Sequence, residues 1–202
     1  MTTNGARGTR VRPGEDRAVE RIVRKTFGAL AGRGGERLLY AMMDDTPVGI
    51  LGLALGQAGL RRVTFVKGED PFIEGLLTDY PDRPVVRSNR LDPVRRSLDR
   101  YFAGKSFTFE TPVDLSDMSP FQQRVLHELV KVPAGRVTTY SRLAVQAGRP
   151  KAARAVGNAM HGNPVPIIVP CHRCLRGDGS LGGYGGGLWV KEWLLKLEGA
   201  VL

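Results

Sequence analysis

Residues 163 to 173 read NPVPIIVPCHR, and this stretch decides how the rest of the chain is interpreted. Proline has no N–H and a fixed φ, so a run with Pro164, Pro166 and Pro170 cannot form a helix or a central strand. We therefore predict a rigid extended segment whose apolar residues, 167 to 169, enter the core. Such a segment would hold the next side chain, Cys171, in one place.

Cys171 is followed by His172 and Arg173. A thiol beside two groups that can be cationic is expected to favour the thiolate, the reactive form of cysteine. The local chemistry thus favours a nucleophile and leaves an inert, buried cysteine as the alternative. His172 is the nearest base, but neighbours in an extended segment point to opposite faces. A bridging water would solve that geometry.

The composition is that of a globular protein with one large or two small domains. The chain has 202 residues, of which 42% are hydrophobic and 25% charged. It has no apolar run of membrane-spanning length, and the N-terminus has no apolar core of a signal peptide, so we expect a soluble, intracellular protein without membrane contact. The net charge of +10 favours a polyanionic partner, although a solvated basic surface would give the same number.

The first half shows helical and strand patterns but no catalytic constellation. We expect a disordered basic tail over 1–14 and a structural α/β domain over 15–114. Its predicted parts are an amphipathic helix over Glu15–Leu30, a meander of strands at Leu38–Met43, Gly49–Leu55 and Leu60–Val66, a helix over Pro71–Tyr80, a connection through Val85 and Val86, and a helix that begins at Pro93 with Asp92 as its cap.

The second half, residues 115–202, predicts a compact helical domain. Ser119, Pro120 and Gln122 form a capping box for a first helix. A second helix begins near Thr139, and a third runs from Pro150 to Gly162. The last two are typical of a helix-turn-helix, a pattern that unrelated helix pairs share.

The third predicted helix combines small residues with cations. Arg149, Lys151 and Arg154 could meet phosphate, while the alanines and glycine would allow a close approach to another surface. A tightly packed internal helix with solvated ends is the other interpretation.

Two further motifs are weak. Cys171 and Cys174 form a C-x-x-C, which could be a redox pair or half of a zinc site, but a glycine-rich loop follows where a redox motif would open a helix. The G-x-G-x-x-G at 177–182 lacks the βαβ unit of a dinucleotide site. A flexible loop that shapes a pocket around Tyr184 fits it better, with a last helix over Leu188–Leu197.

Taken together, the segments GRPKAARAVGNAMHGNP, NPVPIIVPCHR and GGYGGGLWVKEWLLKLEG resemble the O6-alkylguanine-DNA alkyltransferases (methylated-DNA–protein-cysteine methyltransferases). The resemblance covers 119–199 almost without gaps, and the first half matches only in the order of its elements. It implies an α+β fold: a ribonuclease-H-like N-terminal sheet domain and a winged-helix-like C-terminal domain. It also implies a single-turnover protein that acts on double-stranded DNA as a monomer, needs no cofactor or metal, and resides in the cytoplasm (at the nucleoid) or in the nucleus.

The resemblance further implies roles for individual residues. Cys171 would accept the alkyl group from the O6 of a flipped guanine, while His172 draws the thiol proton through a water and Glu198 orients His172. Tyr140 would assist rotation of the nucleotide and donate to guanine N3, and Arg154 would fill the vacated place in the stack. Asn163 would brace the site. The remaining assignments are the pocket residues Met160, Tyr184, Gly185 and Gly186, and the DNA contacts Gln122, Ser141, Arg149 and Gly177, with Lys151 beside them.

The chain departs from the family pattern at two places near the expected pocket. Gly185 replaces a serine found in many members, which removes a hydroxyl, and Cys174 replaces an aliphatic residue. A DNA-lesion-binding protein of the same fold that transfers nothing is the alternative function, although such relatives lack the cysteine at position 171. A C-x-x-C oxidoreductase would need Cys174 for turnover.

Overall fold

The N-terminal half of the described chain is built on one four-stranded sheet. The computed structural model describes residues 37–200, so the expected tail and the helix over 15–30 lie outside it. The strands are β1 (Leu38–Met43), β2 (Ile50–Leu55), β3 (Leu60–Val66) and β4 (Val85–Arg87), in the order β3-β2-β1-β4. β1, β2 and β3 pair antiparallel, which confirms the predicted meander.

β4 was not predicted, because its sequence suggested only a connection. Its three residues pair parallel with β1, and Leu38 lies opposite Val85. Parallel pairing joins segments that are distant in the sequence, so a strand this short carries no local signal of its own. The prediction of a plain connection at Val85 and Val86 was therefore wrong.

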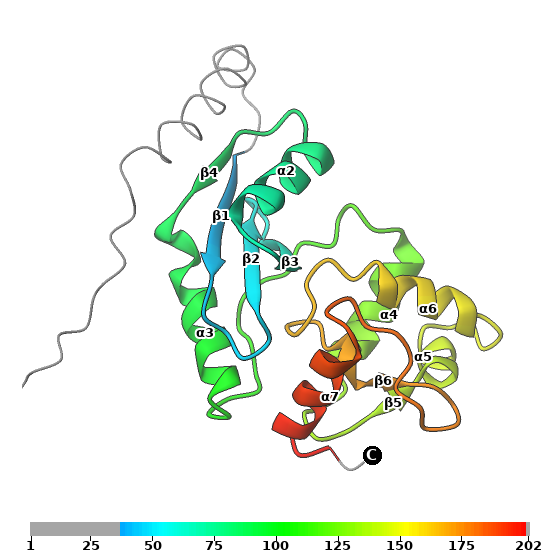
Figure 1. The fold of residues 1–202 in the computed structure, drawn as a ribbon. Coiled ribbons are helices and arrows are strands. Elements are labelled where there is room, and N and C mark those ends of the chain that lie inside the picture. The colour runs from blue at the N-terminus through cyan, green and yellow to red at the C-terminus, as the bar shows by residue number, and fades with distance from the viewer. Residues whose placement is uncertain (1–36, 201–202) are drawn as a thin grey trace, which may run out of the picture. The chain divides into compact units, whose positions relative to one another are not determined.

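Two helices and one 3₁₀ turn complete this half (Figure 1). α2 covers Glu69–Asp79, η1 covers Asn89–Leu91, and α3 covers Asp92–Phe102. The predicted cap at Asp92 was wrong: Leu91 is the N-cap, no side chain caps the helix, and the carboxylate of Asp92 instead pairs with Arg95 at 3.3 Å. The η1 turn extends the chain's helical path into α3, so no separate cap is needed there.

The two faces of the sheet are buried in different clusters. Tyr40 and Met42 pack with Phe72 and Leu76 of α2, in the smaller cluster. The alternate residues, such as Ala41 and Met43, belong to a larger cluster that also includes apolar residues of α3 and of the C-terminal helices. The period of two along β1 thus divides the core between its two faces.

The regular elements of the C-terminal half are mainly helices. Its helices are α4 (Pro120–Val130), α5 (Tyr140–Gln146), α6 (Ala153–His161) and α7 (Leu188–Leu197), with short parallel strands β5 (Thr138–Thr139) and β6 (Cys174–Leu175) and the 3₁₀ helix η2 (Cys171–Arg173). Figure 1 shows α5 followed directly by α6, the arrangement expected of a helix-turn-helix. With the sheet of the first half, this gives the expected α+β fold.

The start of α4 matches the sequence prediction, and the start of α6 does not. Ser119 and Gln122 form both hydrogen bonds of the capping box at α4. α6 begins at Ala153 instead of Pro150, and its N-cap, Ala152, makes no side-chain hydrogen bond. Lys151 therefore lies in the turn between α5 and α6.

The proline-rich segment is bent, so the prediction of an extended segment was wrong. The Val169 N–H donates to the Val165 carbonyl at 2.9 Å, and Ile167 has φ +74°. A β-branched residue in this region of φ is strained and persists only where its surroundings hold it. Ile167 is fully buried, which supplies that constraint and confirms that the apolar residues enter the core.

Residues 37–200 belong to one compact unit. The predicted division at 114/115 stays a prediction.

Candidate active site

Asn163 holds the bend and the thiol together. Its Nδ2 donates to the Val169 carbonyl at 2.9 Å and to Cys171 Sγ at 3.1 Å, and its Oδ1 accepts from the Val165 N–H at 3.1 Å. One side chain thus fixes the turn before η2 and places a donor on the sulfur at the start of η2. The bracing role expected of Asn163 stays a prediction, and it would use these three hydrogen bonds.

The Cys171 thiol is protonated at rest, contrary to the sequence expectation. Cys171 is buried, and burial raises the pKa of its thiol to about 11, although the hydrogen bond from Asn163 and the charge of Lys191 act in the opposite direction. The expected cationic neighbours do not favour a thiolate. Arg173 is paired with a carboxylate, and burial lowers the pKa of His172, which keeps its imidazole neutral. The sulfur therefore needs a base during reaction.

His172 is completely buried, and its ring is held by Glu198. Nε2 lies 2.9 Å from Glu198 Oε1. Burial alone would raise the pKa of Glu198, but hydrogen bonds from His172, Arg173 and Tyr101 hold it at about 2, so the carboxylate is ionised. An ionised carboxylate only accepts hydrogen bonds, so Nε2 carries the proton and Nδ1 has a free lone pair. Nδ1 is buried and has no hydrogen-bond partner among residues 37–200, so it is the ring's available base.

Arg173 explains why a carboxylate lies at the C-terminus of α7. Its Nε donates to Glu198 Oε2 and its Nη2 to Oε1, both at 2.8 Å, while Nη1 donates to the Val132 carbonyl at 2.5 Å. A two-pronged pair of this kind is strong and directional. It offsets the unfavourable placement of Glu198 as the C-cap of α7.

Sequence reasoning missed two residues of this network. Tyr101 of α3 donates its hydroxyl to Glu198 Oε1 at 2.6 Å, and nothing in an apolar helical stripe indicates such a bond. Lys191 is fully buried, and its Nζ donates to the carbonyls of Cys174, at 2.7 Å, and Leu181. The signal for Lys191 was available, because it lies between Val190 and Leu194 on the buried side of α7.

Tyr140 and the glycine-rich loop lie close to each other. Tyr140 is the first residue of α5, and a Cβ at Gly182 would come within 2.9 Å of its hydroxyl. Burial raises the pKa of Tyr140, which keeps the phenol protonated as a donor. The absence of a side chain at Gly182 is thus a condition for the position of Tyr140.

The other predicted pocket residues are Tyr184, Gly185, Gly186 and Met160. Tyr184 packs edge-on against His172, with 6.3 Å between ring centroids, and against Phe65, at 5.8 Å. A Cβ at Gly186 would touch Phe65 at 3.0 Å, whereas one at Gly185 would meet nothing within 4 Å. Met160 is buried on α6. Space alone therefore does not require glycine at position 185.

Most of the residues expected to meet DNA are exposed. These are Ser141, Arg149, Lys151, Arg154 and Gly177. Arg149 lies over the ring of Phe121 at 5.0 Å, which limits where its guanidinium can point. Gln122 is half-buried and its Oε1 accepts from Ser119, so its carbonyl is already engaged. The DNA contacts of all six residues stay predictions.

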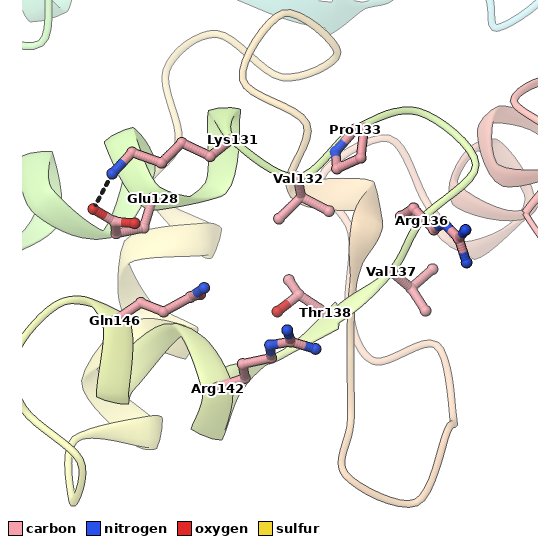
Figure 2. A pocket seen from close by; sticks show the side chains of 9 residues that line it. All are labelled: Glu128, Lys131, Val132, Pro133, Arg136, Val137, Thr138, Arg142 and Gln146. Atoms are coloured by element: carbon pink, nitrogen blue, oxygen red, sulfur yellow. Dashed lines mark hydrogen bonds and ion pairs between the residues drawn. The ribbon is translucent and has the colours of Figure 1, made fainter.

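Two cavities of the described part lie away from the thiol. The first has a volume of about 370 Å³ and is lined by residues of α4, β5, α5 and the loop after α4, among them Val132, Thr138 and Arg142. Figure 2 shows the side chains that line it. A second, of about 360 Å³, lies between Arg61, Tyr80 and Gln122. Cys171 lines neither. The reactive centre is therefore identified by its hydrogen bonds and burial, and not by a hollow.

Neither a metal cluster nor a membrane-spanning helix occurs among residues 37–200. No three histidine, cysteine, aspartate or glutamate side chains there gather closely enough to hold an ion. No helix of that range is long and apolar enough to cross a bilayer.

Two family models match nearly all of the described chain. The model described as "6-O-methylguanine DNA methyltransferase, ribonuclease-like domain" matches residues 38–115, and the one described as "6-O-methylguanine DNA methyltransferase, DNA binding domain" matches residues 120–200.

Individual relatives give the same result. The chain is 38% identical to the methylated-DNA–protein-cysteine methyltransferase of Methanosarcina acetivorans, over 80% of this chain and 99% of that one. It is 40% identical to the human protein of that name, over 77% and 78%. A structure of Mycobacterium tuberculosis OGT in complex with DNA superposes with a TM-score of 0.68 at 35% identity, over 80% of this chain and 92% of that one.

Proposed function

This chain belongs to the 6-O-methylguanine-DNA methyltransferase family, and on that basis we propose that it repairs DNA by moving an alkyl group from guanine O6 to its own Cys171. The observation that carries the assignment is the buried His172, next in sequence to the thiol, with Nε2 fixed by an ionised Glu198 and Nδ1 left as a base. The single-turnover character follows from the product, because a thioether has no easy leaving route.

The transfer step balances with the groups in the site. Nδ1 of His172 takes the thiol proton through one bridging water, and Glu198 stabilises the imidazolium that forms. The thiolate sulfur then attacks the alkyl carbon, so the S–C bond forms as the C–O6 bond breaks and its electron pair stays on guanine. The bond from Asn163 Nδ2 to the sulfur lowers the energy of the thiolate.

Tyr140 serves the leaving group. Guanine departs as an anion, and a neutral phenol is a suitable donor to its N3. The raised pKa of Tyr140 keeps that proton on the phenol until charge develops on the base. Gly182, close to the hydroxyl, allows the phenol to remain in this position.

DNA would approach the exposed side of α5 and α6. The target atom is unreachable inside a duplex, so the nucleotide must be extruded. Arg154, exposed near the start of α6, would occupy the vacated space, while Ser141, Arg149, Lys151, Gln122 and Gly177 contact the backbone. We propose that the protein acts as a monomer in the compartment that holds the DNA, the nucleoid or the nucleus.

A methyl-transfer assay tests the proposal. The protein is incubated with a duplex that carries O6-methylguanine, and peptides are mapped by mass spectrometry. We expect one methyl group on Cys171, absent in Cys171→Ala and retained in Cys174→Ala. A folded, reduced protein that binds the duplex and transfers no methyl would instead be a lesion-binding relative. No methyl transfer, together with a thiol–disulfide exchange activity that Cys174→Ala abolishes, would favour the C-x-x-C oxidoreductase.

A further inference from the structure

Tyr101 reaches the active site from the other half of the chain. It lies on α3, within the residues that match the ribonuclease-like family model, whereas His172 and Glu198 lie within those that match the DNA-binding model. The ring is fully buried and is surrounded by Phe102, Phe107 and Phe109, with centroids 5.5 to 5.7 Å away. This packing leaves the hydroxyl little freedom.

The hydroxyl shares its acceptor with the catalytic histidine. Tyr101 OH donates to Glu198 Oε1 at 2.6 Å and lies 3.5 Å from His172 Nε2, which bonds to the same oxygen at 2.9 Å. A short O–H···O⁻ bond is among the stronger protein hydrogen bonds. Burial and the charge of Glu198 raise the pKa of Tyr101, so the phenol stays protonated and donating.

We propose that Tyr101 is a positioning residue for alkyl transfer: its hydroxyl fixes Oε1 of Glu198 against His172 and moderates the pull of that carboxylate on the imidazole proton. The inference rests on the proposed function, and it gives the ribonuclease-like half a part in positioning the catalytic histidine. Arg173 donates to both oxygens of Glu198, whereas the Tyr101 hydroxyl donates to Oε1 and also lies 3.5 Å from Nε2.

The proposal predicts a shift in the pH dependence of the reaction. The titratable and charged groups around His172 are Glu198 at the C-cap of α7, Lys191 of α7, Arg173 of η2, Tyr101 of α3, and Tyr184, which packs edge-on against the ring. Without the hydroxyl, Oε1 keeps more negative charge for the imidazolium, so His172 should protonate at higher pH. The acid limb of the plot of transfer rate against pH should then move to higher pH by about half a unit or more, because the hydrogen bond from Tyr101 to Glu198 is lost.

The test uses Tyr101→Phe in the full chain, with Tyr40→Phe as the matched control. Tyr40 is also buried and also donates to a glutamate, Glu69 Oε1 at 2.8 Å, but it belongs to the other core cluster. Single-turnover methyl transfer to Cys171 is measured against pH for each protein. We expect the upward shift, with a plateau rate about threefold to tenfold lower, only in Tyr101→Phe. An unshifted limb in Tyr101→Phe, or the same shift in Tyr40→Phe, would overturn the proposal.

Two further measurements keep the test decisive. Incorporation of 3-fluorotyrosine at position 101 retains the shape and makes the hydroxyl a stronger donor, so the limb should move to lower pH. Titration of the His172 ring by nitrogen NMR in the DNA-free protein needs no alkyl transfer. If the His172 titration shifts in Tyr101→Phe but the wild-type protein transfers no methyl group, only the proposed function fails. If the His172 titration does not shift in Tyr101→Phe, the role of Tyr101 fails.

Discussion

Asn163 is the residue that couples backbone shape to sulfur chemistry. Asn163→Asp keeps the acceptor for the Val165 N–H but replaces the donor to Cys171 Sγ and to the Val169 carbonyl with a negative oxygen. A carboxylate beside the sulfur disfavours the thiolate, whose pKa is already raised to about 11. We expect methyl transfer to slow by about tenfold to a hundredfold, as for a lost hydrogen bond to a charged group.

The measurement is a single-turnover rate, with DNA affinity determined in parallel. Ultraviolet titration of the thiolate should place the midpoint for Cys171 above that of the wild-type protein. A variant that reacts at the wild-type rate would show that the bond to Sγ contributes nothing to attack.

Glu198 makes stability depend on acid. The pKa of Glu198 is about 2 in the folded protein and 4.5 in the unfolded chain. Its contribution to the free energy of unfolding is therefore complete above about pH 4.5 and is lost as the pH falls toward 2. Glu198→Gln should remove this dependence. At neutral pH it should cost about 3–5 kcal/mol, because the buried guanidinium of Arg173 loses its counter-charge.

Urea unfolding at a series of pH values checks both parts of this expectation. His172 is buried and neutral, so its contribution to stability also falls as the pH drops below its ordinary pKa. The contribution of Glu198 is therefore taken from the difference between the wild-type protein and Glu198→Gln below pH 4.5. If Glu198→Gln loses stability over that window as steeply as the wild-type protein, the ion pair is not what acid disrupts.

At the scale of elements, the loop before α7 places one glycine against a functional side chain. Gly182 and Gly179 both have positive φ, +66° and +84°, so alanine strains either backbone similarly, by about 1–2 kcal/mol. Only at position 182 would the added Cβ meet the Tyr140 hydroxyl. We expect Gly182→Ala to slow methyl transfer by about tenfold or more, while Gly179→Ala lowers the melting temperature and leaves the rate nearly unchanged.

The comparison of the two variants separates strain from contact. Thermal melting should show similar losses, and single-turnover rates should differ. Equal rates in Gly182→Ala and Gly179→Ala would mean that Tyr140 can move without consequence for the reaction.

The elements predicted from sequence are those with local signals. Alternating or continuous apolar runs located β1 and β3, and the capping box located α4. The proline segment was misjudged because proline excludes helix and strand without distinguishing an extended chain from a bend. The bend is held by the three hydrogen bonds of Asn163, whose partners lie two to eight positions further along the chain.

At the scale of the whole molecule, the active site depends on long-range contacts that no motif contains. The sequence itself paired Cys171 with His172, and only the resemblance added Glu198. The structure joins His172 and Glu198 to Tyr101 of α3. The protonated thiol was also beyond local reasoning. Adjacent cations suggested a thiolate, but burial of the sulfur and pairing of Arg173 with Glu198 reverse that effect.

The net charge of +10 affects DNA binding by the whole protein. Affinity for a duplex should fall steeply with salt, because each phosphate neutralised releases counterions. Arg149→Ala should weaken binding and reduce the slope of log affinity against log salt by about 1, since Arg149 is exposed and directed by Phe121. Arg96→Ala, an equal loss of charge on the exposed side of α3, is the control and should leave the slope unchanged. Fluorescence anisotropy at several salt concentrations measures both. Equal slopes for the two variants would mean that total charge, and not a phosphate contact at Arg149, governs binding.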